Sequence, residues 1–339
     1  MRALLSLTLA VLVLTLTSPA WSRPLVAILA DPSGTETTDL IAPYAILAES
    51  GAVDVVIVSP TLAPVPLMPG EGWVKPQASR ASFDRAHPGG ADVVIVPYMM
   101  NMRDPDRAVW LRAQAGHGAR IVSICAGAEA LAYAGLLDGR QATSHWSSIK
   151  HLSKAYPKVS WRRDGRWVTD GNVTTSAGVS ASIPTALNLL AELAGEPVMR
   201  ATAARLGLEA PSRAHAGAAY HLDSGHLATA AGNYAMFWLH EAVAVPIADG
   251  FDDLAFAATL DGWSRTFRSK AWAVAPSAGA TSRHGLVVLP PAGERRYGRT
   301  VQATRGEPVQ ASLAAITAAY GRRTARFVAL QVEHPAALR

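Results

Sequence analysis

Four short apolar runs, interleaved with helical segments, constrain the fold more than any other feature of this sequence. The runs are LVAILA (25–30), DVVIVS (54–59), ADVVIVP (91–97) and RIVSI (120–124). Their valine and isoleucine residues are continuous rather than alternating, which is typical of strands buried on both faces. Helical spacing is found at 37–50, 104–118 and 126–137. The sequence therefore predicts an α/β fold in which helices sandwich a parallel sheet.

The chain beyond residue 205 has a different texture. Residues 210–241 begin with small and polar side chains and are interpreted as a linker. Setting Gly34 on Gly250 without gaps then brings DVVIVSP (54–60) onto KAWAVAP (270–276), and 181–209 also resembles 311–333. This pattern predicts a second, degenerate α/β repeat that lacks the middle of the first. The alternative is that two unrelated α/β segments share a helix–strand rhythm.

The N-terminus has the pattern of a secretory signal peptide. Arg2 precedes an apolar run from Ala3 to Thr17, and the small residues Ala20 and Ser22 are spaced as a cleavage site requires. The run is short for a membrane span, which needs about 20 apolar residues. We expect residues 1–22 to be removed and the protein to be periplasmic or secreted, without stable membrane insertion. The alternative is an uncleaved membrane anchor.

Composition and charge narrow the function classes. Half of the residues are hydrophobic and 17% are charged, which is an ordinary soluble globular balance. The net charge is +5, but the basic residues are scattered rather than grouped on one helix or face, so we expect no nucleic-acid partner. The sequence contains no glycine loop that would cradle phosphates, and we expect no cofactor.

The only cysteine of the chain is the main candidate for chemistry. Cys125 lies between the strand at 120–124 and the helix at 126–137, at the sheet edge where ligands collect in open α/β folds. A helix N-terminus favours a thiolate, and the amides of Ala126 and Gly127 could hold an anion there. The alternative is a buried cysteine that acts as a small hydrophobe. A single cysteine excludes an internal disulfide.

Two segments carry a resemblance to a known family. IVSICAGAEALAYAGLLDGRQATSHW (121–146) and DGNVTTSAGVSASIPTALNLLAEL (170–193) resemble the DJ-1/PfpI superfamily, which has the class I glutamine-amidotransferase-like fold. They are most similar to the branch of AraC-type regulator N-terminal domains and isonitrile hydratases. The resemblance implies a flavodoxin-like DJ-1/PfpI domain over 23–209 and a truncated, degenerate copy over 242–339.

The resemblance also implies partners for the cysteine. The family has an acidic residue four positions before a proline on the first helix, and Asp39 stands four before Pro43. Asp39 could share a proton with the sulfur or act as acid and base. It could instead be a helix N-terminal residue favoured by the dipole. A histidine twenty positions after the cysteine corresponds to His145, which could steer protons or simply pack beside Trp146.

The departures from the family limit what activity can be carried over. PfpI-type proteases have a histidine directly after the cysteine, and many relatives in this branch have a threonine that isonitrile hydratase uses; this chain has Ala126 there. The helix-turn-helix units of the regulators are replaced by the second repeat. We therefore expect action on a small polarised substrate such as an isonitrile, amide or aldehyde. The alternative is a non-catalytic ligand-binding or thiol-sensing protein.

Two further expectations concern metals and assembly. HLDSGH (221–226) and His240-Glu241 contain metal-capable side chains, but their spacing fits no common zinc pattern, so we expect no metal site. In the gapless register Asp39 falls on Ala255, so the second copy lacks the chemical groups. Because members of the superfamily commonly dimerise, we expect a homodimer or an intramolecular pseudo-dimer in which the second half covers the first.

Overall fold

The computed structural model describes residues 23–338. The predicted signal peptide, 1–22, lies outside the described residues, and so does the basis for the predicted localisation. Within the described part, none of the helices combines the length and apolar character that a membrane crossing requires.

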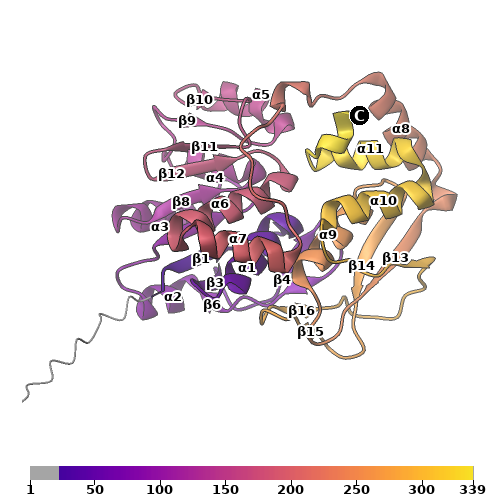
Figure 1. Cartoon of the computed structure of the whole chain (residues 1–339), viewed down its shortest axis with the longest axis horizontal. Helices are drawn as coiled ribbons and strands as arrows, with labels where there is room; N and C mark the ends of the chain where they lie inside the picture. Colours follow the sequence, from indigo (N-terminus) through magenta and orange to yellow (C-terminus); the bar gives the residue numbers. More distant parts are fainter. Residues whose placement is uncertain (1–22, 339) are drawn as a thin grey trace, which may run out of the picture.

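A seven-stranded sheet forms the first unit. Most of its strands are labelled in Figure 1. Its order is β11-β12-β8-β7-β1-β3-β6, and all neighbours are parallel except the β11–β12 hairpin. The strands are β1 (Leu25–Leu29), β3 (Asp54–Ser59), β6 (Ala78–Ser79), β7 (Val93–Val96), β8 (Arg120–Ser123), β11 (Trp167–Asp170) and β12 (Val173–Ser176). The predicted parallel α/β architecture is confirmed. The loop of this hairpin is Gly171-Asn172.

Helices cover both faces of this sheet. They are α1 (Thr37–Ser50), α2 (Arg80–Ala86), α3 (Pro105–Gly116), α4 (Ala128–Tyr133), α5 (Trp146–Ala155), α6 (Ser182–Ala194) and α7 (Glu196–Leu206). Successive strand residues alternate between two cores: Val93 and Ile95 join the core of α1, α6 and α7, while Val94 and Val96 join that of α2, α3 and α4. Burial on both faces explains why the strands are continuously apolar.

A second α/β unit follows, and its three parallel strands have the same spatial order as three strands of the first unit. Its strands β13 (Glu241–Pro246), β14 (Ser269–Val274) and β17 (Arg299–Thr300) form a parallel sheet in the order β14-β13-β17. The equivalent order in the first unit is β3-β1-β7. Helix α9 (Asp253–Ser264) connects β13 to β14 as α1 connects β1 to β3. The gapless alignment placed the first residues of α1 and α9 on each other.

The helical pair that ends each unit is also similar. Helices α10 (Pro308–Tyr320) and α11 (Arg322–Gln331) are joined by one residue, Gly321, with φ 85° and ψ 163°. Helices α6 and α7 are joined in the same way by Gly195, with φ 89° and ψ 154°. Both glycines lie in a region that L side chains rarely adopt, so a one-residue turn between helices requires glycine here.

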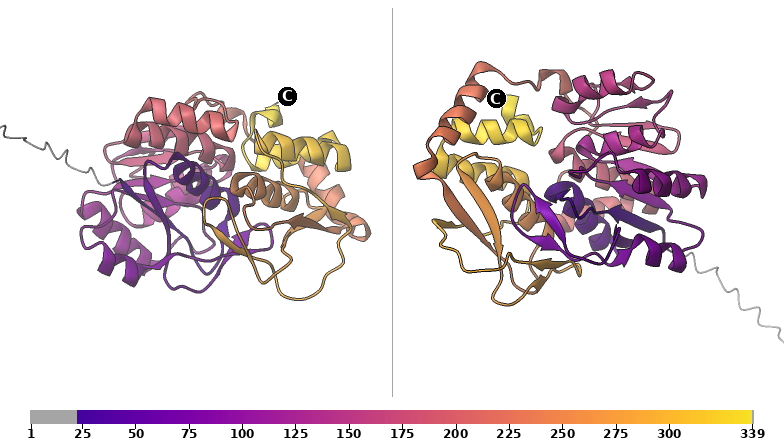
Figure 2. Two further views of the ribbon diagram at one scale, coloured as in Figure 1. Left: turned by 60° about the horizontal axis from the view of Figure 1, so that its bottom comes forward. Right: turned by 180° about the vertical axis from the view of Figure 1, so that it is seen from behind.

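The two units share one apolar core. Helix α1 packs against α9, and 11 of its 14 residues are buried. The hairpins β4 (Val65–Met68)–β5 (Trp73–Val74) and β15 (Ala280–Thr281)–β16 (Val287–Leu289) pair edge to edge through β5 and β16. Figure 2 shows the two units side by side.

The stretch interpreted as a linker, 210–241, is partly helical. It contains α8 (Ser224–Ala235), which packs on α11. Asp223 is the N-cap of this helix, and its side chain accepts a hydrogen bond from His226 N. The sequence analysis did not predict α8, because its many alanine and glycine residues give the segment only a weak amphipathic pattern. Two short strands, β9 (Gln141–Ala142) and β10 (Ser160–Trp161), pair beside the first sheet, and β2 (Thr35–Glu36) pairs with β4.

Candidate functional site

Cys125 occupies a strained turn at the carboxyl end of β8. Its φ is +56°, which is uncommon for a residue with a side chain and persists only where the surroundings enforce it. The backbone is fixed on both sides, since Ile124 N donates to Val96 O (3.0 Å) and Cys125 N donates to Ala177 O (3.1 Å). A short 3-10 turn, Cys125–Gly127, then leads into α4. The predicted order of strand, turn and helix is therefore present, and the turn Cys125–Gly127 forms an elbow between β8 and α4.

Gly127 has a steric role in this turn. A Cβ at this position would lie 2.2 Å from the carbonyl oxygen of Val96, so only glycine permits the turn to pack on the end of β7. Its N–H already donates to Ile124 O (2.9 Å). The geometry therefore does not offer the Gly127 amide to an anion. The backbone of Ala126, by contrast, lowers the pKa of the Cys125 thiol.

Asp39 lies in the first turn of α1 and is completely buried. Its Oδ2 accepts a hydrogen bond from Tyr98 N (3.2 Å), whereas Oδ1 has no partner in the described structure. Burial raises the pKa of Asp39 to about 7. A buried oxygen without a hydrogen-bond donor carries negative charge at a high energetic cost, which favours the protonated form of the Asp39 carboxyl.

Glu36 is a second carboxyl of the site, which the sequence analysis missed. It is the N-cap of α1, and its Oε2 accepts from Asp39 N at 2.5 Å. Its Oε1 accepts from Arg265, so both oxygens act as acceptors, which suits a carboxylate even though burial and the neighbouring acids Asp261 and Asp39 raise its pKa. The residue lies three positions before Asp39, and the S/T/D/N pattern of ordinary caps gave no signal for it.

Arg265 and Asp261 bring the second unit into the site. Arg265 Nη2 lies 2.8 Å from Glu36 Oε1, and its Nε lies 2.5 Å from Asp261 Oδ1. Asp261 Oδ2 in turn accepts from the Thr38 hydroxyl at 2.8 Å. The Arg265 side chain is 16% exposed, and the acids around it raise its pKa, so it stays charged. One guanidinium thus balances the buried carboxyls beside the cysteine.

The sulfur itself is a poor thiolate in this structure. Cys125 is 6% exposed, and burial raises the pKa of its thiol well above the ordinary value. Asp39 and Glu36 raise this pKa further, while the Ala126 amide and Arg265 lower it. The expectation that the helix N-terminus holds a thiolate is therefore wrong for the resting state, because burial and two carboxyls outweigh the amide. No hydrogen bond joins Cys125 to Asp39 within residues 23–338.

His145 is occupied with structural contacts. It is the N-cap of α5: its Nδ1 accepts from Ser147 N, and its Nε2 bonds the carbonyl of Gln331 in the second unit at 2.9 Å. Burial lowers the pKa of His145, so the neutral ring is favoured. These bonds support the interpretation of His145 as a packed residue beside Trp146, and they tie the two units together.

Glu333 of the second unit binds the loop that follows β12. Its Oε2 accepts from Gly178 N (2.6 Å), and its Oε1 lies 2.7 Å from the ring of His215, with both side chains nearly inaccessible to water. Glu333 has φ +56°, a second strained non-glycine residue. Within residues 23–338 no group of three or more histidine, cysteine or acidic side chains is arranged to hold a metal ion.

Comparison with known proteins places this site in a family. The model of the DJ-1/PfpI family matches residues 25–192. Isonitrile hydratase of Pseudomonas putida is 34% identical over 163 residues, which are 46% of this chain and 67% of that protein. The chain belongs to the DJ-1/PfpI family. The crystal structure of Drosophila melanogaster DJ-1beta, 24% identical with a TM-score of 0.50, covers 55% of this chain and 99% of its own, which shows the shared fold.

Regulators are also among the relatives of this DJ-1/PfpI protein. The HTH-type transcriptional regulator CdhR of Pseudomonas aeruginosa is 41% identical over 98 residues, but the match is 27% of this chain and only 29% of the regulator. The family match ends at residue 192, so Asp261, Arg265, Gln331 and Glu333 all lie beyond it. The second unit therefore adds contacts to a site whose cysteine and Asp39 lie within the family region.

Proposed function

We propose that this DJ-1/PfpI protein uses Cys125 as a nucleophile and Asp39 as its proton partner on a small, neutral, polarised substrate, in a hydration or hydrolysis reaction. One observation carries the proposal: a strained elbow cysteine lies in the field of a buried carboxyl with pKa about 7 and one unpartnered oxygen. Perturbed groups and backbone strain of this kind cluster at reactive sites. The similarity to isonitrile hydratase supports the substrate class.

The protonation states of Cys125 and Asp39 suit a neutral substrate better than an anionic one. A thiol that rests protonated must lose its proton as the sulfur attacks, and ionised Asp39 can receive it. With an isonitrile, the sulfur would bond to the terminal carbon while that carbon takes the proton from Asp39, giving a thioimidate. Water then adds to the same carbon and the thiol leaves with a proton, so that the net reaction is addition of water to give a formamide.

A non-catalytic ligand-binding protein is the second candidate. Burial of Cys125 and the raised pKa of its thiol favour it, and so does Ala126 in the place where the hydratases of this branch carry threonine.

In either case we propose that the mature protein is exported, on the strength of the apolar pattern in 1–22. Detecting the N-terminus of the protein in a periplasmic fraction by mass spectrometry would test export; a chain that retains Met1 in the cytoplasm contradicts it.

Turnover separates the two candidates. The full chain is assayed for formamide production from alkyl and aryl isonitriles, together with Cys125→Ser, Asp39→Asn and the control Ser148→Ala on α5. The catalytic proposal predicts turnover by the wild type and the control, and a loss of at least 100-fold in both site variants, as general acid–base and nucleophile losses produce. An unchanged rate in Cys125→Ser contradicts the nucleophile. Saturable binding without turnover in every variant supports the second candidate.

We also propose that the second unit is a degenerate copy that serves as an internal partner for the first. The α1–α9 packing and the β5–β16 pairing join equivalent elements, as an isologous dimer interface does. Expressing residues 23–210 alone tests this, because α1 then loses its cover. The proposal predicts an insoluble or dimeric product; a stable, soluble monomer contradicts it.

A further inference from the structure

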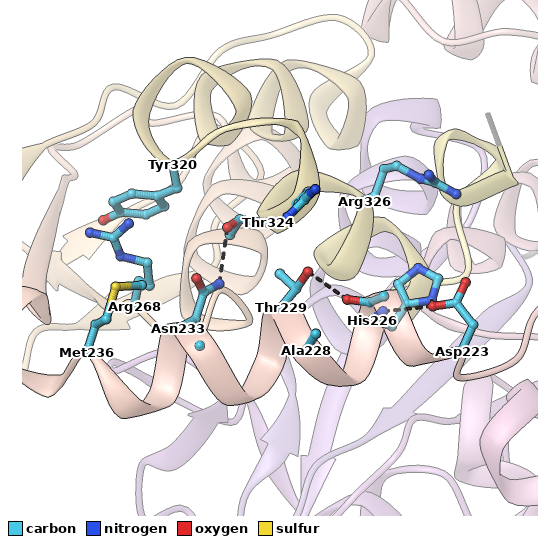
Figure 3. A pocket seen from close by; sticks show the side chains of 13 residues that line it. Asp223, His226, Ala228, Thr229, Asn233, Met236, Arg268, Tyr320, Thr324 and Arg326 are labelled. Atoms are coloured by element: carbon cyan, nitrogen blue, oxygen red, sulfur yellow. Dashed lines mark hydrogen bonds and ion pairs between the residues drawn. The ribbon is translucent and has the colours of Figure 1, made fainter.

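The second unit contains a cavity that is separate from the cysteine site. Figure 3 shows it between α8, the residues that precede β14, and the α10–α11 pair. Its volume is about 560 Å³, within the usual range for small-molecule sites. All the residues that line it lie beyond residue 222, so no part of the Cys125 elbow contributes to it.

Positive side chains outnumber negative ones in the lining of this cavity. Three guanidinium groups line it, those of Arg268, Arg323 and Arg326. Its single acidic residue, Asp223, is already used, since it caps α8 through His226 N (2.7 Å) and lies 2.8 Å from the His226 ring. In the described part of the chain none of the three arginines forms a salt bridge. Arg326 reaches only the carbonyl of Ala337, at 3.2 Å.

The groups between the arginines are held in place. Asn233 Nδ2 donates to Thr324 Oγ1 (3.1 Å) and to Thr266 O (2.9 Å), which ties α8 to α11 and fixes the cavity floor. The guanidinium of Arg268 lies over the ring of Tyr320, 5.0 Å from its centre. Arg268 Nε is buried and has no hydrogen-bond partner. Arg268 also lines the cavity, where an anion would supply acceptors for the terminal N–H groups of its guanidinium.

The helix that carries two of the arginines reinforces this imbalance. Arg323 lies in the first turn of α11, which contains no acidic residue and has no side-chain cap. The positive end of a helix dipole disfavours cations, so this arrangement gains stability when negative charge is nearby. Met236 and Tyr320 border the cavity beside Arg268, which leaves room for a less polar part of a ligand (Figure 3).

We propose that this cavity binds a small molecule bearing an oxyanion group, a phosphate or a carboxylate, with Arg268 and Arg323 as the principal contacts. The planar fork of a guanidinium binds both kinds of oxyanion through paired N–H donors. The site is independent of the chemistry proposed for Cys125, and helix α8, which the sequence indicated only as part of a linker, forms one of its walls.

Titration calorimetry on the full chain tests the proposal, with inorganic phosphate and with acetate as probes, each at an ionic strength held constant with sodium chloride. We expect saturable binding of at least one probe, and the stronger one identifies the anion class. Arg268→Ala and Arg323→Ala should each weaken binding at least tenfold. Arg322→Ala is the matched control, because it removes the same charge from the same helix at a residue that does not line the cavity, and it should change affinity less than twofold.

Two results would overturn the proposal. The first is an absence of saturable binding for both probes in wild-type protein whose circular dichroism is normal. The second is an equal loss of affinity in Arg322→Ala and Arg323→Ala, since this would indicate general attraction to a basic surface. Arg323→Lys, which keeps the charge and removes the fork, should lie between wild type and Arg323→Ala; a loss as large as that of alanine also supports recognition through the paired N–H groups.

Discussion

At the scale of single residues, the site contains two residues in energetically unfavourable settings, one in its backbone conformation and one in its burial. Cys125 is kept at positive φ, and Asp39 is buried with one oxygen unsatisfied. The position of Cys125 could be predicted because a strand followed by small residues and a helix has few geometries. The protonation of its thiol could not, because burial and the approach of Glu36 depend on packing that one sequence does not reveal.

Gly127→Ala tests the steric role of the elbow glycine. A methyl group 2.2 Å from the Val96 carbonyl must displace the turn, so we expect the free energy of unfolding to fall by about 2–4 kcal/mol. Gly116→Ala in α3, where an added Cβ meets nothing within 4 Å, is the control and should change stability by less than about 1 kcal/mol. Urea unfolding followed by circular dichroism measures both. Equal effects in the two variants would refute the steric account.

Asp39 makes a specific prediction for the pH dependence of stability. Its pKa is about 7 in the folded state and near ~3.9 when unfolded, so the folded chain binds more protons between these values. The contribution of Asp39 to the free energy of unfolding therefore decreases as pH rises from about 4 to 7. Asp39→Asn removes this decrease, and at pH 8 it should be more stable than wild type by at least about 2 kcal/mol.

The comparison is made by urea unfolding of both proteins at pH 5 and pH 8. Glu294→Gln, on an exposed loop, controls for the loss of a carboxyl in general. If wild type and Asp39→Asn lose stability in parallel between the two pH values, Asp39 does not carry the proton.

At the scale of helices and strands, periodicity predicted most boundaries well. The helix at 37–50 and the strand at 54–59 were predicted with the bounds that α1 and β3 have. Helix α4 is shorter than the predicted 126–137, because the chain leaves the elbow through a 3-10 turn and ends the helix at Tyr133. What periodicity could not show is that α1 is apolar on nearly all sides because α9 covers its outer face.

Leu260 of α9 tests how closely the two units pack. It is fully buried, and its side chain fills the space that a Cβ at Gly70 of the first unit would need. Leu260→Ala should lower the free energy of unfolding by about 2–5 kcal/mol. Leu227→Ala, at an exposed position of α8, should stay within about 0.5 kcal/mol of wild type. Two separate unfolding transitions, with only one shifted by Leu260→Ala, would contradict a shared core.

At the scale of the whole molecule, the second unit does more than cover a surface. Through Arg265 and Asp261 it sets the charge beside the cysteine, and through Gln331 and Glu333 it holds the loops on the other side. The sequence predicted a second copy without its own chemical groups. It gave no means of predicting that residues of the second unit enter the first site, because the alignment of the two units relates equivalent positions and does not show which side chains meet in space.

Arg265→Ala should therefore change both stability and the site. Removing the guanidinium leaves Glu36 and Asp261 buried without their counter-charge, which destabilises a fold by about 3–5 kcal/mol. It should also raise the pKa of Cys125 further, because Arg265 lowers it in the wild type. Arg85→Ala, at an exposed position of α2, should alter neither property. If the folded Arg265→Ala variant has an unchanged Cys125 titration, the second unit does not influence the charge at the cysteine site.

The pH dependence of Cys125 alkylation tests the central pairing most directly, and the single cysteine makes every adduct assignable by mass spectrometry. Iodoacetamide labelling is followed from pH 6 to pH 11 in wild type and Asp39→Asn. We predict a wild-type midpoint above the free value of ~8.5, and a lower midpoint in Asp39→Asn, because an ionised neighbour no longer opposes the thiolate. A wild-type midpoint at or below ~8.5, or identical midpoints in the two proteins, would contradict the account.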